Sequence, residues 1–456
     1  MDSNTLQKDK ILNDSIWRLA FSLSWPIIIA MVLYGLNVVF DAILIGAFLN
    51  ENALAAVVMS YPVVSLTMGI GSLIGVGAGS LLSILLGKND IEQQSTLLGN
   101  VNVLCIALSL VYIVLAIVFG KTILQFMGAK GEILELATTY FNHTIFGSFF
   151  WVYGFATNMI LRAEGKMKQA ASIMGIGLVV NILISYVFIE VFNLGISGAA
   201  WGTNIGMLLY SFLGYYYLKS KYVSFPAQPN SLAYNKPTLK TILSLGMSSL
   251  FMVVMNLIQA MAVFKSVSQF GNAVDISVYG AAYRVYTLLL MPIAGFMRAL
   301  QPVVGVNYGA GLHTRTKQAY FIFITISTLF ILPVWILLMV YSNTILPTMI
   351  SPDLLNNQDH INFQILLWAV PVIPFLFMTM NFYPSIGKGK PAVLLIVIRQ
   401  IIFYVPAVLI LPSMFGISSI YIASSVIEYV VAIISIIMVS KELRQLSVIN
   451  LKPVSV

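Results

Sequence analysis

Long apolar runs separated by short polar segments dominate the chain from residue 17 to residue 440. A helix rises about 1.5 Å per residue, so roughly 20 apolar residues cross the hydrocarbon core of a membrane. Every run reaches that length. The pattern predicts an all-α polytopic membrane protein with twelve transmembrane helices, at 17–48, 54–87, 96–120, 134–161, 169–192, 196–218, 240–269, 276–308, 316–342, 360–386, 392–414 and 417–440.

A repeat divides these helices into two sets of six. Gly165–Ala170 resembles Gly387–Ala392 at an offset of 222 residues, and the same offset places Gly87 on Gly309. An even number of spans in each half means that the two lobes run the same way through the membrane, related by an axis along its normal. We therefore expect a tail at 1–16, an N-lobe at 17–219, a linker at 220–238, a C-lobe at 239–441 and a second tail at 442–456.

Composition and charge agree with a membrane protein. The chain is 59% hydrophobic and only 9% charged, against about 25% for an ordinary soluble domain. Eighteen of the 24 basic residues fall in the two tails and in alternate loops, so the net charge of +8 reflects topology rather than nucleic-acid binding. The positive-inside rule predicts that both termini are cytoplasmic in a multi-pass protein of the plasma (inner) membrane, with the first apolar segment retained.

The first predicted helix carries one acid, Asp41, well inside its apolar run. Intramembrane carboxylates are rare, face a protein interior or a water-filled cavity, and usually mark an ion or proton pathway. The alternative is a structural acid that Asn37, Tyr140 or Asn181 satisfies by hydrogen bonding and that never changes its protonation. The sequence favours a role for Asp41 in an ion or proton pathway.

The C-lobe differs in charge from the N-lobe. At the repeat position of Asp41 stands Val263, and the 240–269 helix contains no acid. Arg298 lies deep in its helix, so we expect it to pair with Glu428 or with backbone carbonyls. Alternatively, it attracts an anionic or zwitterionic part of a substrate, or holds Asp41 ionised in one state. The other charged residues of these helices, whose roles stay open, are Lys265, Arg284 and Arg399.

Several kinds of chemistry are not indicated. No Gly-Lys-Ser/Thr phosphate-binding loop occurs, which argues against ATP-driven transport. The three histidines have no metal-ligand spacing, the single cysteine, Cys105, excludes an internal disulfide, and no catalytic arrangement is predicted at a membrane interface. We expect neither an enzyme nor a metal site nor a cofactor beyond a coupling ion.

Several short motifs, spread from about residue 15 to residue 445, resemble the multidrug and toxic compound extrusion (MATE) family, and within it the bacterial MepA-like branch. They are Gly75–Gly79, Leu85–Asp90, Arg162–Gly165, Leu194–Ala200, Gln301–Pro302, Asn307–Ala310 and Gly387–Pro391. The order of the motifs, together with the repeat, carries the resemblance. It implies a cation-coupled exporter of amphipathic, often cationic, organic molecules that works by alternating access.

The resemblance also implies a cation-coupling site in the N-lobe. Asp41 matches the functional acid, and Tyr140, Asn181 and Thr203 match a tyrosine, an asparagine and a threonine near it. Four residues after Asn181, where many relatives have a second aspartate, this chain has Ser185, which we include as the fifth residue of the predicted coupling site. A lone carboxylate offers few hard ligands for Na⁺, whereas burial favours its neutral form. We therefore expect H⁺ as the coupling ion, with Na⁺ as the alternative.

Substrate contacts are expected in the cleft between the lobes, where flexible thioethers and aromatic faces suit varied lipophilic ligands. Plain packing is the competing interpretation of each such residue. We expect a monomer among membrane lipids; the rival functions are a flippase of a lipid-linked precursor and a receptor or scaffold that transports nothing. The predicted cleft residues are Met252, Met255, Phe296, Met297, Arg298, Gln301, Met378, Met380 and Tyr383.

Overall fold

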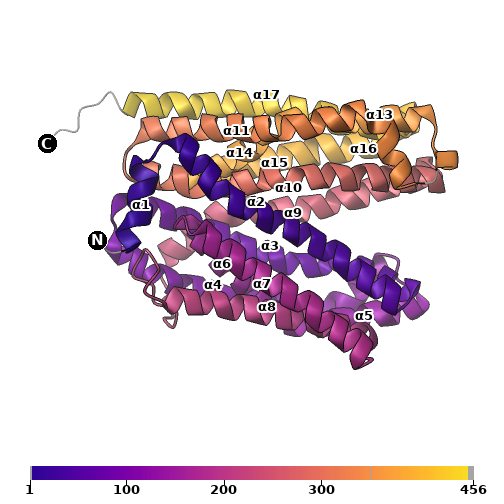
Figure 1. The fold of residues 1–456 in the computed structure, drawn as a ribbon, viewed down its shortest axis with the longest axis horizontal. Helices are drawn as coiled ribbons and strands as arrows, with labels where there is room; N and C mark the ends of the chain where they lie inside the picture. The colour runs from indigo at the N-terminus through magenta and orange to yellow at the C-terminus, as the bar shows by residue number, and fades with distance from the viewer. Residues whose placement is uncertain (1–2, 351, 450–456) are drawn as a thin grey trace.

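The computed structural model describes residues 3–350 and 352–449, and these residues form helices joined by short loops (Figure 1). The remainder of both predicted tails, residues 1–2 and 450–456, lies outside the described residues. In chain order the helices are α1 (Ser3–Asn13), α2 (Ile16–Phe48), α3 (Glu51–Lys88), α4 (Ile91–Phe126), α5 (Gly131–Phe146), α6 (Ser148–Ala163), α7 (Met167–Tyr186), η1 (Val187–Val191), α8 (Gly195–Lys219), α9 (Lys236–Phe270), α10 (Ala273–Gly309), α11 (His313–Val340), α12 (Ser342–Ile345), η2 (Leu346–Thr348), η3 (Pro352–Leu354), α13 (Asn357–Leu367), η4 (Val370–Val372), α14 (Ile373–Ser385), α15 (Gly389–Val397), η5 (Ile398–Tyr404), α16 (Val405–Phe415) and α17 (Ser418–Ile449).

Each of the twelve predicted segments coincides with a helix or with a broken helix. Among the described residues, ten helical spans are long and apolar enough to cross a membrane, and the pair α5 and α6, bent by 55°, makes an eleventh. The twelfth predicted span corresponds to α8, which has 25 residues but is not among those candidates. Its glycines and tyrosines make it less apolar than its neighbours. The all-helical membrane fold was therefore predicted from the apolar runs, and the breaks within them were not.

Local sequence explains where several helices begin and turn. The Asn50 side chain accepts a hydrogen bond from the backbone N–H of Ala53 (2.7 Å) and caps α3. Gly165 and Gly387, which the 222-residue offset relates, both have φ of +81°, a conformation that glycine adopts without strain. The repeat is thus visible in the backbone as well as in the sequence.

Two lobes meet at the end of the molecule where α1 and the last turns of α17 lie, and they diverge toward the other end (Figure 1). The N-lobe contains α2 to α8 and the C-lobe α9 to α17. The linker is shorter than the predicted 220–238, because α9 begins at Lys236 with Pro237 in its first turn. Helix α17 continues to Ile449, beyond the predicted lobe boundary at 441.

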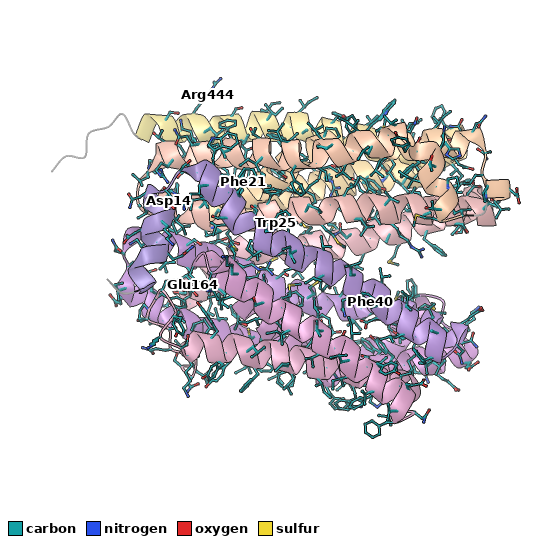
Figure 2. All side chains as sticks on the ribbon, in the orientation of Figure 1. Asp14, Phe21, Trp25, Phe40, Glu164 and Arg444 are labelled. Carbon is teal, nitrogen blue, oxygen red and sulfur yellow. The ribbon has the colours of Figure 1, made fainter. Side chains whose placement is uncertain are left out.

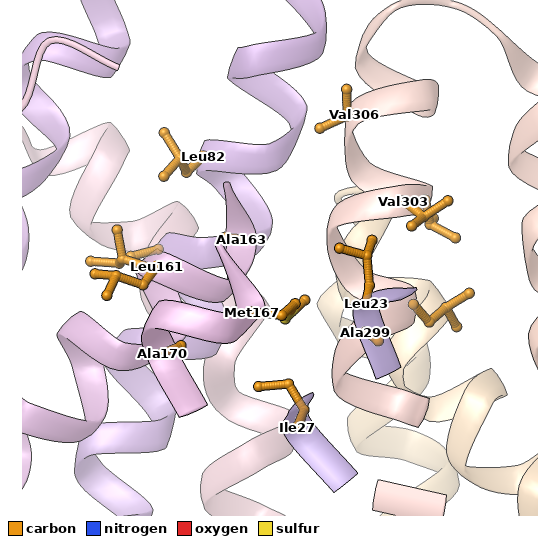
Figure 3. Packing of buried hydrophobic residues seen from close by; sticks show 14 of the residues in the cluster. Leu23, Ile27, Leu82, Leu161, Ala163, Met167, Ala170, Ala299, Val303 and Val306 are labelled. Carbon is orange, nitrogen blue, oxygen red and sulfur yellow. The ribbon is translucent and has the colours of Figure 1, made fainter. Parts of the chain in front are cut away.

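Helices α3 and α9 cross at the contact between the lobes, and glycines permit the close approach. A Cβ on Gly246 would lie 1.7 Å from the carbonyl oxygen of Leu73, and one on Gly77 would lie 1.9 Å from that of Ile242. A large apolar cluster fills this end with side chains from both lobes, including Met167 of α7 and Ala299 of α10 (Figure 3). Each lobe has further apolar clusters of its own.

The outer surface carries many exposed apolar side chains, as expected of a protein that contacts lipid. On α2, Phe21 and Trp25 are exposed and point away from the helix (Figure 2). The polar residues of the candidate functional site therefore lie inside the lobes.

Helix α1 lies against both lobes at the end where they meet. The Gln7 side chain donates to the carbonyl of Gly165 in the N-lobe (3.1 Å). Arg315 of the C-lobe donates to the carbonyls of Ile11 (3.1 Å) and Asp14 (2.8 Å). The predicted N-terminal tail is thus largely a docked helix.

Candidate functional site

A cavity of about 270 Å³ lies inside the N-lobe, and Asp41 of α2 lines it. Three of the other four predicted coupling residues line the same cavity: Tyr140 of α5, Asn181 of α7 and Thr203 of α8. Four helices therefore bring four of the five predicted residues together. The cavity is otherwise mostly apolar, with Val57, Val64 and Met207 in its wall.

The Asp41 carboxylate makes no hydrogen bond or salt bridge to any residue in the described part of the chain. Its electrostatic neighbours are the hydroxyl groups of Tyr61 and Tyr140. A carboxylate that is buried for structural reasons is normally held by hydrogen bonds. The alternative of an acid satisfied by Asn37, Tyr140 or Asn181 finds no support in this geometry.

A chain of amide and hydroxyl groups runs beside the carboxylate instead. Asn37 donates to the side-chain oxygen of Asn181 (2.7 Å), Asn181 donates to the Thr203 hydroxyl (3.1 Å), and Thr203 donates to the carbonyl of Ala199 (3.0 Å). Asn37 precedes Asp41 by four residues and therefore shares its face of α2. The chain ties α2 to α7 and α8 at the level of the acid.

Ser185 does not line the cavity. It is buried, and its hydroxyl packs against Gly202 of α8, where an added Cβ would lie 2.2 Å from it. The reason is helical rotation: Ser185 follows Asn181 by one turn, but it faces the tight contact of α7 with α8. Any coupling ion in the cavity would therefore have no ligand from this position.

Sequence reasoning did not assign a role to several other lining residues: Tyr34, Tyr61 and Trp151. The indole N–H of Trp151 is buried without a hydrogen-bond partner in the structure. Trp151 stands in an aromatic stretch of the sequence, and this position did not indicate a functional role because aromatic residues pack at many places in a membrane protein. Tyr34 lies one turn before Asn37, and that spacing was the available clue.

The C-lobe contains a cavity of about 250 Å³ in a corresponding place. The 222-residue offset carries Tyr34, Asn37 and Tyr61 onto Asn256, Gln259 and Tyr283, and all three of these line the C-lobe cavity. Gln259 accepts a hydrogen bond from the Gln400 side chain. Its counterpart in the N-lobe, Asn37, also bonds to a side-chain amide, but there Asn37 is the donor and Asn181 the acceptor. Of the predicted cleft residues, the structure gathers Met252, Met255 and Met380 here.

Arg399, which also lines this cavity, forms a salt bridge with Glu428 of α17. Its Nε lies 3.0 Å from each carboxylate oxygen, and its Nη2 donates to one of them. The predicted pairing of Arg298 with Glu428 is therefore wrong, because Glu428 already has a guanidinium partner on η5. Arg298 instead contacts the sulfur of Met159 across the lobes (3.1 Å).

Most of the remaining predicted cleft residues are buried in this conformation. Phe296 is buried against Phe330, and Met378 and Tyr383 are buried in the large apolar cluster to which both lobes contribute. Gln301 is buried between the lobes, where its amide donates to Ser80 (3.1 Å). Met297 is partly buried at the same core. The helices bury these faces against each other, which sequence spacing does not reveal.

The two other charged residues of the C-lobe helices whose roles were open, Lys265 and Arg284, are exposed. Neither side chain lines the N-lobe cavity or the C-lobe cavity. This agrees with snorkelling toward a membrane interface.

Glu164, which follows α6 at the end where the lobes meet, is a buried acid outside the cavities (labelled in Figure 2). Burial raises the pKa of this carboxyl to about 7, although the backbone N–H of Ser224 donates to it (2.6 Å) and Lys166 is near. Through that hydrogen bond it holds the linker against the N-lobe.

No group of three or more His, Cys, Asp or Glu side chains that could hold a metal ion occurs in residues 3–350 and 352–449. The N-lobe cavity therefore presents one carboxylate with neutral amide and hydroxyl groups. Such a set can exchange a proton with water in the cavity, or hold a monovalent cation loosely.

Comparison with known proteins gives a consistent result. The family model described as MatE matches residues 26–187 and 245–409. The multidrug export protein MepA of Staphylococcus aureus (strain MSSA476) is 23% identical over 437 residues, 93% of each chain. MepA of Staphylococcus haemolyticus (strain JCSC1435) is 22% identical over 442 residues, 95% of each chain. A solved structure described as the outward-facing conformation of a multidrug resistance MATE family transporter of the MOP superfamily matches with a TM-score of 0.89 at 24% identity, over 96% of this chain and 98% of that one.

Proposed function

Because this chain belongs to the MatE family, we propose that it is a proton-coupled antiporter that exports amphipathic, often cationic, organic compounds by alternating access. One observation carries the proposal: the Asp41 carboxylate faces a cavity without a hydrogen-bond or ion-pair partner in the described structure. An acid kept in this state is free to change its protonation, and intramembrane acids usually serve ion or proton pathways.

The choice of H⁺ over Na⁺ rests on the ligand set. A dehydrated Na⁺ needs several oxygen ligands, and here one carboxylate is available while Ser185 packs elsewhere. The amide oxygen of Asn181 accepts a hydrogen bond from Asn37, which makes it a poorer ion ligand. A proton requires none of these groups.

Protonation at Asp41 can act on the lobes through α2. This helix packs against α7 within the N-lobe and against α10 of the C-lobe. A neutral carboxyl gains an O–H donor that a carboxylate lacks. That donor can bond to the side-chain oxygen of Asn37, one turn away on α2, or to that of Asn181 on α7. Either bond would compete with the Asn37–Asn181 hydrogen bond and so weaken the link between α2 and α7. We propose that this exchange of partners shifts α2 and drives the change of access.

Substrates are proposed to enter between the lobes and to contact the thioethers that line the C-lobe cavity. Met252, Met255 and Met380 present flexible, polarizable surface beside Tyr283 and Tyr286. Aromatic rings attract organic cations, and thioethers adapt to different shapes. The MepA relatives are described as multidrug exporters, which supports this substrate class.

We also propose the topology that the charge pattern predicts. Both tails and the linker face the cytoplasm, the chain lies in the plasma membrane as a monomer, and its two lobes are residues 17–219 and 239–441. The asymmetric distribution of Lys and Arg supports the orientation. Because Cys105 is buried, a cysteine placed in either tail can be labelled selectively from one side.

The test uses proteoliposomes in sodium-free buffer and measures proton movement driven by a cationic dye, for wild type and Asp41→Asn. The expected result is proton flux in the wild type and a loss of about 100-fold or more in the variant, since the amide keeps the shape but cannot titrate. Ser185→Ala is the matched control and should keep most of the flux, because Ser185 lies outside the cavity.

Two results would contradict the proposal. A flux that appears only when Na⁺ is added would assign coupling to sodium. Dye binding without movement of either ion would favour the flippase or the receptor, and transport of a lipid-linked precursor would then decide between these two.

A further inference from the structure

Two arginines from different lobes meet at the same methionine. Arg162 of α6 is 2% exposed, and its Nη1 and Nη2 lie 3.9 Å from the sulfur of Met159 and 3.6 Å from that of Met174. Arg298 of α10 approaches the Met159 sulfur to 3.1 Å. One sulfur atom thus touches both guanidinium groups, and they are close enough to interact electrostatically.

Neither arginine has an acidic partner in the described structure, where the two salt bridges belong to other residues. The Nε–H of each arginine is buried and makes no hydrogen bond. Glu164, near Arg162 in sequence, accepts instead from the backbone of Ser224. Two positive charges therefore share one buried site without compensation.

A third donor completes the cluster. The hydroxyl of Tyr210, on α8, is buried and has no hydrogen-bond partner, and it interacts electrostatically with both arginines. Three unpaired donors converge here, and among residues 3–350 and 352–449 the only acceptors that the side chains of the two arginines reach are thioether sulfurs, which accept weakly. Buried charges in proteins are normally paired, because an uncompensated one costs several kcal/mol.

We propose that this cluster binds an anion, held by Arg162, Arg298 and Tyr210. The ligand is a single small anionic group, either an inorganic anion such as chloride or the carboxylate of a zwitterionic substrate. Guanidinium groups suit both, since they present several N–H donors in one plane. Met159 and Met174 are flexible side chains that can yield space, and Arg298 is only half-buried, which provides access.

The site has a second property, which rests on the proposed alternating access. Its donors come from both lobes, α6 and α8 on one side and α10 on the other, so it is complete only while the lobes are in contact at this end. Without an anion, the two like charges oppose that contact. A bound anion therefore favours the conformation seen here, by linkage of binding to conformation.

The experiment measures the midpoint of thermal unfolding of the purified full chain in detergent, with chloride replacing gluconate at constant ionic strength. Chloride at about 150 mM should raise the wild-type midpoint by several degrees, because chloride is compact and loses its water readily, whereas gluconate is a strongly hydrated polyol without an apolar part to carry it into the protein interior. Arg298→Gln should abolish the shift and Arg298→Lys should keep part of it. Arg284→Gln, an exposed arginine on the same helix, is the matched control and should retain the full shift.

A second arm separates the two sources of the anion. A rhodamine dye with a free carboxyl group is compared with its ethyl ester, in gluconate, for binding to wild type and Arg298→Gln. If Arg298→Gln loses binding of the free-acid dye but keeps binding of the ester, the site binds the carboxylate of the substrate. A chloride shift with equal binding of acid and ester assigns it to an inorganic anion.

The inference is overturned if chloride and gluconate give the same midpoint and Arg298→Gln binds acid and ester as the wild type does. If Arg298→Gln does not fold, anomalous scattering from bromide in wild-type crystals decides the question, since a peak within hydrogen-bond distance of both guanidinium groups is required. Ester-driven proton flux that depends on Asp41 would persist in the overturned case, so the proposed function would survive it.

Discussion

The two lobes share a fold, but they differ in whether the charged side chain that lines the cavity of each lobe has an ion-pair partner. Both salt bridges in the described part of the chain, Arg399 with Glu428 and Lys388 with Glu442, lie in the C-lobe. The N-lobe contains Asp41, Arg162 and Glu164 without any ion pair. Repeat-related cavities therefore differ in whether a charged group in them is free to change its state.

This difference suggests a division of labour between the lobes. A carboxylate paired with a guanidinium stays ionised, because protonation would leave the cation uncompensated. In this structure the Arg399 guanidinium beside the C-lobe cavity compensates the charge of Glu428. Asp41 has no such partner, so the N-lobe is where a coupling ion can act.

The largest effect is expected when the salt bridge between Arg399 and Glu428 in the C-lobe is removed. Glu428→Gln leaves Arg399 buried without a counter-charge, and we expect the free energy of unfolding to fall by about 3–5 kcal/mol. Thermal or denaturant unfolding in detergent measures this loss.

The double variant Arg399→Met with Glu428→Leu serves as the control. Removing both charges together leaves no unpaired ion, so its stability should return to within about 1–2 kcal/mol of the wild type. A single variant as stable as the double would mean that the pair is solvated and that the contrast between the lobes is smaller than described.

The next test concerns an unpaired acid of the N-lobe. Burial raises the pKa of Glu164 to about 7, above its ordinary value near 4.3. The folded state therefore binds a proton more readily than the unfolded state, and the stabilisation is lost as pH rises from about 4.3 to about 7. Glu164→Gln should remove this dependence and be more stable at pH 8, by up to about 3 kcal/mol.

Unfolding midpoints at pH 5 and pH 8 check this prediction. Lys166→Gln is a useful companion variant, because it removes the nearby cation and should leave the direction of the pH dependence unchanged. If wild type and Glu164→Gln respond to pH in parallel, the Glu164 carboxyl titrates at its ordinary value and the N-lobe contrast rests on Asp41 and Arg162 alone.

The smallest effect is expected at the second salt bridge. Lys388 has a side-chain exposure of 42% and bonds to Glu442 at 2.7 Å. Exposed ion pairs contribute about 0–1 kcal/mol, so Lys388→Ala should hardly change the unfolding midpoint. A loss above about 2 kcal/mol would show that this pair belongs with Arg399 and Glu428 as a buried one.

Much of the fold was predictable because lipid imposes a simple rule on sequence. Apolar runs had to match the spans, and the repeat at 222 residues had to reappear as lobes of similar build. The bend of 55° at Gly147 and the π-helical segments η1 and η5 were not predictable. They arise from packing between helices, which hydropathy does not record.

The candidate site was predictable to a lesser degree. Asp41 stood out because an acid inside an apolar run is unusual, and four of the five coupling residues converge on one cavity. The predicted partner of Glu428 was wrong because two arginines on different helices, Arg298 and Arg399, could have paired with it. The sequence does not show which positions of two helices lie side by side. Ser185 was misplaced for a related reason, since a shared helical face can be split between a cavity and a tight contact.

Helix α1 has a kinetic consequence. It contacts the N-lobe through Gly165 and the C-lobe through Arg315, so it bridges the joint between them. Any movement that separates the lobes at this end first has to release the helix from one side. In the proposed cycle the residues before the first span therefore contribute to the activation barrier, and we expect a fusion partner or affinity tag attached there to alter turnover without touching a ligand.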